Sequence, residues 1–151
     1  MEDQKEQEQT AGKPLRALIV EDSENDAVFL VRTLRGAGYA LTFERVQTAP
    51  AMRAALESRG WDIVFSDHDM PGFSSQGALK TLRDTGMDLP FIIVSGSIAD
   101  ETAVEVMRMG AHDYLMKGKL ARLVPVVERE LKEAVNRRER RLAELILASF
   151  R

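Results

Sequence analysis

The chain has 151 residues, a length that suits one domain with a proper hydrophobic core. Its 21 Lys and Arg against 24 Asp and Glu give a net charge of -3, which offers no general reason to expect nucleic-acid binding. Cys is absent, no run approaches roughly 18 apolar residues, and the N-terminus lacks the apolar segment of a signal peptide. We therefore expect a soluble, cytoplasmic protein without membrane association.

The first segment with strand character ends in acidic residues. Residues 1–14 are rich in Glu and Gln and show no apolar periodicity, so we expect a disordered leader there. The apolar run from Leu15 to Val20 is typical of a strand, and the acidic pair Glu21 and Asp22 follows it directly. The first strand thus delivers two carboxylates at its end.

A helix, a second strand and a second helix follow. Ser23 or Asn25 can cap the first helix, and Leu41 to Val46 has strand character. Thr48 is the expected N-cap of the second helix, with Pro50 in its first turn. The apolar positions that we expect to face the core are Ala27, Leu30, Val31 and Leu34 in the first helix, and Met52, Ala55 and Leu56 in the second.

The third apolar run, Ile63 to Phe65, is too short for a helix and stops at Asp67 before the turn residues Pro71 and Gly72. In an open α/β sheet, ligands and chemistry lie at the carboxyl ends of the strands. If this strand neighbours the first, its carboxylate meets the acidic pair. At about 5 Å each pair of carboxylates repels by roughly 3 kcal/mol at an effective dielectric near 20, and a divalent cation would relieve that repulsion.

The ligands available at these strand ends are hard oxygens, with no Cys or His cluster, which suits Mg2+ better than zinc. The alternative is that the strand-end acids merely cap the helices that follow them.

Two more strands end in polar side chains. Ser74 or Ser75 starts a third helix, Phe91 to Val94 then runs into Ser95, and Tyr114 to Met116 runs into Lys117. The expected core positions are Ala78, Leu79 and Leu82 in the third helix, and Val104, Met107 and Met109 in the fourth.

Acids, a hydroxyl and a lysine at the ends of four strands are hard to ascribe to capping. At these residues the chain resembles the receiver domain of two-component response regulators, the CheY-like superfamily, over about Leu15 to Leu131. The matching positions are Glu21 and Asp22 for the metal-binding acidic pair, Asp67 with Met70, Pro71 and Gly72 for the phosphoacceptor loop, Ser95 for the Ser/Thr, Tyr114 for the switch aromatic and Lys117 for the lysine.

Strands that alternate with helices predict a parallel sheet covered on both faces by right-handed crossovers. The resemblance implies the order of the strands: a flavodoxin-like (βα)5 three-layer sandwich with sheet order 2-1-3-4-5. That order places the first strand between the second and the third. It would bring Glu21, Asp22 and Asp67 together at one edge.

The resemblance also implies a phosphoacceptor signalling domain rather than an enzyme. Asp67 would take a phosphoryl group from a sensor histidine kinase or a phosphotransfer protein, and no direct contact with nucleic acid is implied. Mg2+ would be held by the side chains of Asp22 and Asp67 and the backbone carbonyl of Asp69, with Glu21 acting through water. Lys117 and Ser95 would contact the phosphoryl group. Movement of Ser95 and Tyr114 would then remodel the face made by the fourth helix, fifth strand and fifth helix.

Three features near the site depart from the family pattern or flank it. Gly118 stands where the family usually has a proline in a cis bond, and a glycine favours the trans form. Asp69 and Ser97 each stand two residues after a site residue, where they can set how easily water attacks an acyl phosphate. We expect His68 to be exposed and solvated.

The last segment is longer than a minimal receiver requires. We assign residues 15–134 to the receiver domain and residues 135–151 to an extension of the fifth helix, which serves as a linker or in dimerisation. Apolar positions at helical spacing predict a helix from about Arg122 to Ser149, roughly 40 Å long. We expect Leu142, Leu145, Ile146 and Phe150 to be buried against a second copy of the chain.

Two other functions stay open at this stage. Asp67, His68 and Asp69 also resemble the Asp-x-Asp motif of haloacid-dehalogenase-type phosphatases, although Pro71 stands where that motif usually has Thr or Val and the acidic pair would have no role. The second alternative is a pure interaction domain that keeps the fold and is never phosphorylated.

Overall fold

The computed structural model describes residues 12–96 and 100–150, and the side chains of residues 100–103 are not described. Within this part, five strands form one parallel sheet in the order β2-β1-β3-β4-β5. The strands are β1 (Lys13–Val20), β2 (Tyr39–Val46), β3 (Ile63–Asp67), β4 (Phe91–Ser95) and β5 (Asp113–Met116). The predicted flavodoxin-like order is therefore confirmed.

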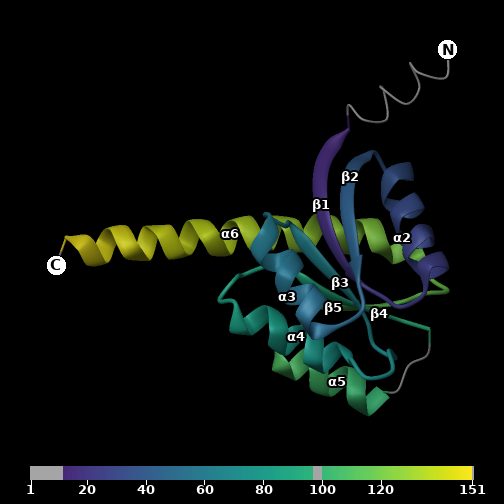
Figure 1. Cartoon of the computed structure of the whole chain (residues 1–151). Coiled ribbons are helices and arrows are strands. Elements are labelled where there is room, and N and C mark those ends of the chain that lie inside the picture. The colour runs from purple at the N-terminus through teal and green to yellow at the C-terminus, as the bar shows by residue number, and fades with distance from the viewer. Residues whose placement is uncertain (1–11, 97–99, 151) are drawn as a thin grey trace.

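Helices cover both faces of the sheet, which gives the three layers expected of strands joined by helical crossovers (Figure 1). The described helices are α2 (Glu24–Gly36), α3 (Ala49–Ser58), α4 (Ser75–Asp84), α5 (Asp100–Met109) and α6 (Leu123–Ser149), with a short 3-10 helix η1 (Leu120–Arg122) before the last. One apolar cluster joins the sheet to α2 and α6, and a second joins it to α3, α4 and α5.

The local predictions for the first three helices are confirmed. Ser23, Thr48 and Ser74 are the N-caps, and each side-chain oxygen accepts a hydrogen bond from a backbone N–H in the first turn. All the predicted core positions of these helices are buried. Because Ser23 and Ser74 cap α2 and α4, the strand-end acids are not the N-cap residues of those helices.

The starts of two strands differ from the predictions, and β2 begins at Tyr39 instead of Leu41. β1 begins at Lys13, two residues before the expected Leu15, because Lys13 pairs with the start of β2. Residues 1–11 of the predicted leader and the flanking Ser97 lie outside the described residues.

The predicted core positions of α5 are wrong for Val104 and Met107 and confirmed for Met109. Val104 and Met107 are 50% and 39% exposed, whereas Val106 is fully buried and Met109 is partly buried against the second apolar cluster. Val104 and Met107 are three positions apart and share a face, but that face points to solvent. A short apolar set shows which residues share a face, whereas tertiary packing decides which face is covered.

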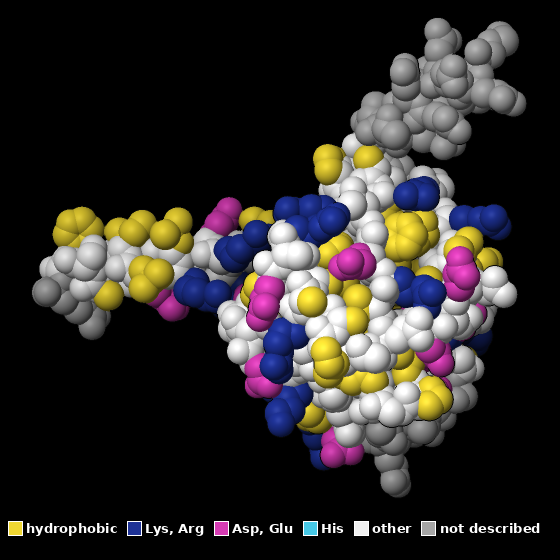
Figure 2. All heavy atoms as spheres, viewed as in Figure 1, with side chains coloured by type: hydrophobic (Ala, Val, Ile, Leu, Met, Phe, Trp, Pro, Cys, Tyr) yellow, Lys and Arg dark blue, Asp and Glu magenta, His cyan; other side chains and the backbone are white. Residues whose placement is uncertain are grey.

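Helix α6 starts against the sheet and then leaves the domain (Figure 1). Its 27 residues span about 40 Å, as predicted. Arg137 and Arg141 pair with Asp88, in the loop before β4, and hold the middle of the helix to the body of the domain. The end beyond Arg141 projects and carries exposed apolar side chains (Figure 2), which are Leu142, Leu145, Ile146, Leu147 and Phe150.

Among the described residues, none of the helices combines the length and the apolar character that crossing a membrane would require.

Candidate phosphoacceptor and metal site

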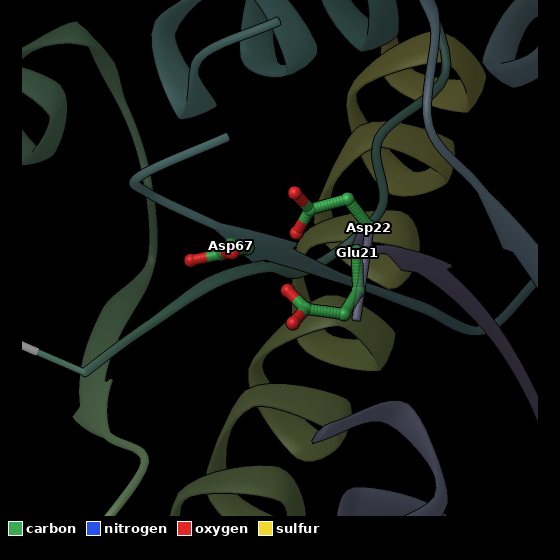
Figure 3. A group of neighbouring side chains, drawn as sticks. All are labelled: Glu21, Asp22 and Asp67. Carbon is green, nitrogen blue, oxygen red and sulfur yellow. The ribbon is translucent and has the colours of Figure 1, made fainter. Parts of the chain in front are cut away.

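Two neighbouring strand ends bring three carboxylates together. β1 pairs with β3 so that Val20 lies opposite Ser66, one residue before Asp67 at the end of β3. Glu21 and Asp22 follow β1, and their carboxylates extend towards Asp67 (Figure 3). One oxygen from each of the three carboxylates lies within 4.8 Å of the others. The sheet order thus concentrates acidic groups, and the repulsion between their charged forms favours a bound cation or a protonated carboxyl group.

Glu21 is the most buried of the three carboxylates, with 3% of its surface exposed. Burial and the neighbouring Asp67 carboxyl raise the pKa of Glu21 from 4.5 to about 8, although the Lys117 ammonium opposes the rise. Arg45, at the end of β2, donates hydrogen bonds from Nη1 to the backbone carbonyl oxygens of Glu21 at 3.2 Å and Asp22 at 3.4 Å. The backbone that presents the acidic pair is therefore fixed from the adjacent strand.

Lys117 brings a positive charge to the same edge. Its Nζ donates hydrogen bonds to Asp26 at 2.7 Å and Glu21 at 2.8 Å, and lies 3.3 Å from Asp67 Oδ2. Burial by itself would lower the pKa of Lys117, but the hydrogen bonds to the two carboxylates outweigh it and raise the pKa above its usual value. The described residues contain no cis peptide bond, so the bond between Lys117 and Gly118 is trans as predicted.

Ser95 and Asp69 extend the polar network on the other side of Asp67. The buried Ser95 donates a hydrogen bond from Oγ to Asp69 Oδ2 at 2.9 Å, and the backbone N–H of Asp69 donates to Asp67 Oδ1 at 3.2 Å. Tyr114, on β5, is partly buried and packs against the second apolar cluster. The structure therefore connects Ser95 to the loop after Asp67 through the Asp69 side chain.

One prediction about this loop is wrong. His68 is buried rather than exposed, and its Nδ1 lies 2.6 Å from the hydroxyl oxygen of Ser75 in the first turn of α4. The hydroxyl of Ser75 supplies a partner that replaces water around the imidazole. This contact ties the residue after Asp67 to the helix that follows.

Sequence reasoning missed two residues at the site, Asp26 and Arg45. Asp26 lies in the first turn of α2, four residues after Asp22, and this closeness in sequence to the acidic pair could have indicated that it lies near the site. Arg45 had a weaker one, since it stands next to the end of the second predicted strand.

The donors at this edge fit a magnesium ion. The three carboxylates supply hard oxygen ligands, and Asp22 is exposed, which leaves room for retained water. Asp67 also lines a small pocket, of about 50 Å³, together with Asp26, Phe29, Lys117 and Leu120. A small anionic group can therefore approach Asp67 between α2 and η1.

The chain is similar to known response regulators along most of its length. Over 114 residues it is 33% identical to the DNA-binding transcriptional regulator NtrC of Salmonella typhimurium, covering 75% of this chain and 24% of NtrC. Over 105 residues it is 36% identical to the sensory transduction protein RegX3 of Mycobacterium bovis, covering 70% of this chain and 45% of RegX3. The chain thus spans less than half the length of these relatives.

Two experimental structures share the fold. NtrX from Brucella abortus superimposes with a TM-score of 0.73 at 28% identity, over 83% of this chain and 28% of NtrX. The receiver domain of the sensor histidine kinase PA1611 from Pseudomonas aeruginosa, which holds a magnesium ion in its active-site cleft, gives a TM-score of 0.66 at 23% identity, over 79% and 98% of the two chains.

A family model for the response regulator receiver domain matches residues 17–128. This match covers well over half of the chain and includes all three carboxylates, Glu21, Asp22 and Asp67. The chain therefore belongs to the response regulator receiver domain family.

Proposed function

We propose that Asp67 is the phosphoacceptor of this receiver domain and that its phosphoryl group comes from a phosphohistidine of a sensor histidine kinase or phosphotransfer protein. The observation that carries this proposal is the position of the Asp67 carboxylate, at a strand end within 4.8 Å of two other carboxylates and 3.3 Å from an ammonium. A carboxylate in that setting can act as a nucleophile, and the neighbouring ammonium can pair with the negative oxygens of an incoming phosphoryl group.

In the transfer, an Asp67 carboxylate oxygen attacks phosphorus, the N–P bond of the phosphohistidine breaks, and the imidazole leaves with the electron pair of that bond. The product is an aspartyl phosphate. Lys117 pairs with the phosphoryl oxygens, and Ser95 exchanges its hydrogen bond with Asp69 for one to the phosphoryl group.

The side chains of Asp22 and Asp67 and the backbone carbonyl of Asp69 would hold Mg2+, with Glu21 acting through water. The bound ion would supply neutralisation of the charge on the transferring oxygens. The receiver in the magnesium-bound structure of the PA1611 kinase has the same fold, which supports this assignment.

Phosphorylation then changes a surface at some distance from Asp67. Inward movement of Ser95 frees space into which Tyr114 turns, and this alters the face formed by α5, β5 and α6. In this structure Tyr114 is partly buried and packs against the second apolar cluster. The phosphoryl group biases the states before and after this movement only as far as it contacts them differently.

The projecting end of α6 joins a second copy of the chain in this proposal. Leu142, Leu145 and Ile146 are between 50% and 64% exposed, and Phe150 is 84% exposed. Apolar side chains gathered on one projecting segment are unusual on the surface of a monomer. A homodimer through α6 would bury them.

Incubation with Mg2+ and a small phosphodonor such as acetyl phosphate tests the phosphoacceptor role. We expect stoichiometric, slowly decaying phosphate on Asp67, and its loss in Asp67→Asn, because an amide keeps the shape but is not a nucleophile. Asp84→Asn, on exposed α4 surface, is the matched control and should label like wild type. Rapid multiple turnover would indicate a phosphatase, and the absence of label would indicate a pure interaction domain.

A further inference from the structure

Lys117 contacts three carboxylates, and one of them, that of Asp26, has no role in the proposed phosphoryl transfer. An ammonium has three N–H donors, and two of them go to Asp26 and Glu21. The contact with Asp67 is the longest of the three, at 3.3 Å against 2.7 Å and 2.8 Å. In the unphosphorylated receiver, Lys117 is therefore held more closely by two other acids than by Asp67.

Asp26 differs from the other acids around Lys117. It lies outside the group of three carboxylates that can hold a metal ion, and its side chain is 46% exposed, against 5% for Glu21 and 7% for Asp67. The backbone N–H of Asp26 donates a hydrogen bond to Oγ of the N-cap Ser23 at 3.3 Å, so the first turn of α2 fixes the position of the Asp26 backbone. Asp26 is thus placed to contact Lys117 without contributing to the metal site.

We propose that Asp26 is a positioning residue that holds Lys117 in the unphosphorylated receiver and competes with a phosphoryl group on Asp67 for the ammonium. This inference rests on the proposed phosphoacceptor function. When the phosphoryl group appears, Lys117 redistributes its donors, and any free energy that the Asp26 contact gives to the unphosphorylated state opposes that change. Removal of the Asp26 charge should therefore favour the phosphorylated state.

The expected effect is modest because Asp26 is nearly half exposed. Ion pairs with exposed partners contribute about 1 kcal/mol or less, which corresponds to a change of about two- to fivefold in affinity. The structure offers a matched control in Glu24, an exposed acid in the same first turn of α2 for which no Lys117 contact exists among the described residues. Glu24→Gln removes the same charge from the same helix turn.

Binding of beryllium fluoride, a phosphoryl analogue, at a fixed Mg2+ concentration tests the proposal. Asp26→Asn should bind beryllium fluoride about two- to fivefold more tightly than wild type, whereas Glu24→Gln should bind like wild type. The affinity for Mg2+ alone should change equally in the two variants, because neither acid belongs to the metal-binding group. Equal or weaker binding of beryllium fluoride by Asp26→Asn would overturn the proposal.

A double-mutant cycle with Lys117→Met separates a contact from a general charge effect. The gain from Asp26→Asn should vanish when Lys117 is absent. If the gain persists, Asp26 acts through overall charge and the proposal is wrong. Failure of the wild-type chain to bind beryllium fluoride with Mg2+ would instead refute the phosphoacceptor function, and this inference with it.

Discussion

Replacing Glu21 with Gln should stabilise the metal-free fold, by an amount that grows with pH. The side chain of Glu21 is 5% exposed, and its pKa is about 8 in the folded chain against an ordinary value of 4.5. A carboxyl group with a raised pKa binds its proton more tightly in the folded state. The stability that this provides is complete below pH 4.5 and is lost as the pH rises through about 8.

The size of the effect follows from the two pKa values. For one carboxyl group titrating at 4.5 in the unfolded chain and at about 8 in the folded chain, the loss is near zero at pH 4 and about 3 kcal/mol at pH 7. Gln keeps the shape and a carbonyl acceptor for Lys117 but does not titrate. The difference in free energy of unfolding between Glu21→Gln and wild type should therefore rise by about 3 kcal/mol over this range.

Urea denaturation of both proteins in EDTA, at several pH values from about 4 to 8, measures this difference directly. Glu24→Gln is the control and should show no comparable dependence on pH. Mg2+ should reduce the difference, because a cation favours the charged carboxylate, and Mg2+ binding to wild type should release a proton. A stability difference that stays constant across this pH range would refute the reasoning.

Three further changes test other parts of the structure. Asp22→Ala should weaken Mg2+ binding by at least about tenfold in a titration, because it removes a direct ligand, and superimposable titrations would contradict the proposed site. Burial and the neighbouring Glu133 raise the pKa of Glu130, which is 3% exposed and whose Oε2 has no hydrogen-bond partner among the described residues. The stability of wild type relative to Glu130→Gln should therefore fall as the pH rises, which urea denaturation of both proteins at pH 4 and pH 8 would measure. A relative stability that rises between these pH values would contradict the prediction. Truncation after Ala134 should convert a dimer to a monomer in sedimentation at tens of micromolar, whereas two monomers, with and without beryllium fluoride, would exclude the dimer.

Much of the fold was determined by local sequence. The N-caps Ser23 and Thr48 and the apolar spacing of the helices depend on residues within a few positions of one another, so the chain itself carries the signal. The acids at the ends of two strands were equally visible. The order of the strands could not be predicted in this way, because periodicity identifies strands but not their neighbours. Only the resemblance to the receiver family predicted that order.

The tertiary structure alone decided which polar groups share a partner. Asp26 and Lys117 are 91 positions apart and meet because successive helical crossovers keep all the strands parallel, so that the start of α2 and the end of β5 both lie at the carboxyl ends of the strands. The burial of His68 and the solvent-facing side of α5 were decided in the same way. A local pattern records whether a side chain is polar or apolar, but an ammonium binds whichever carboxylates the packed elements place within hydrogen-bonding distance.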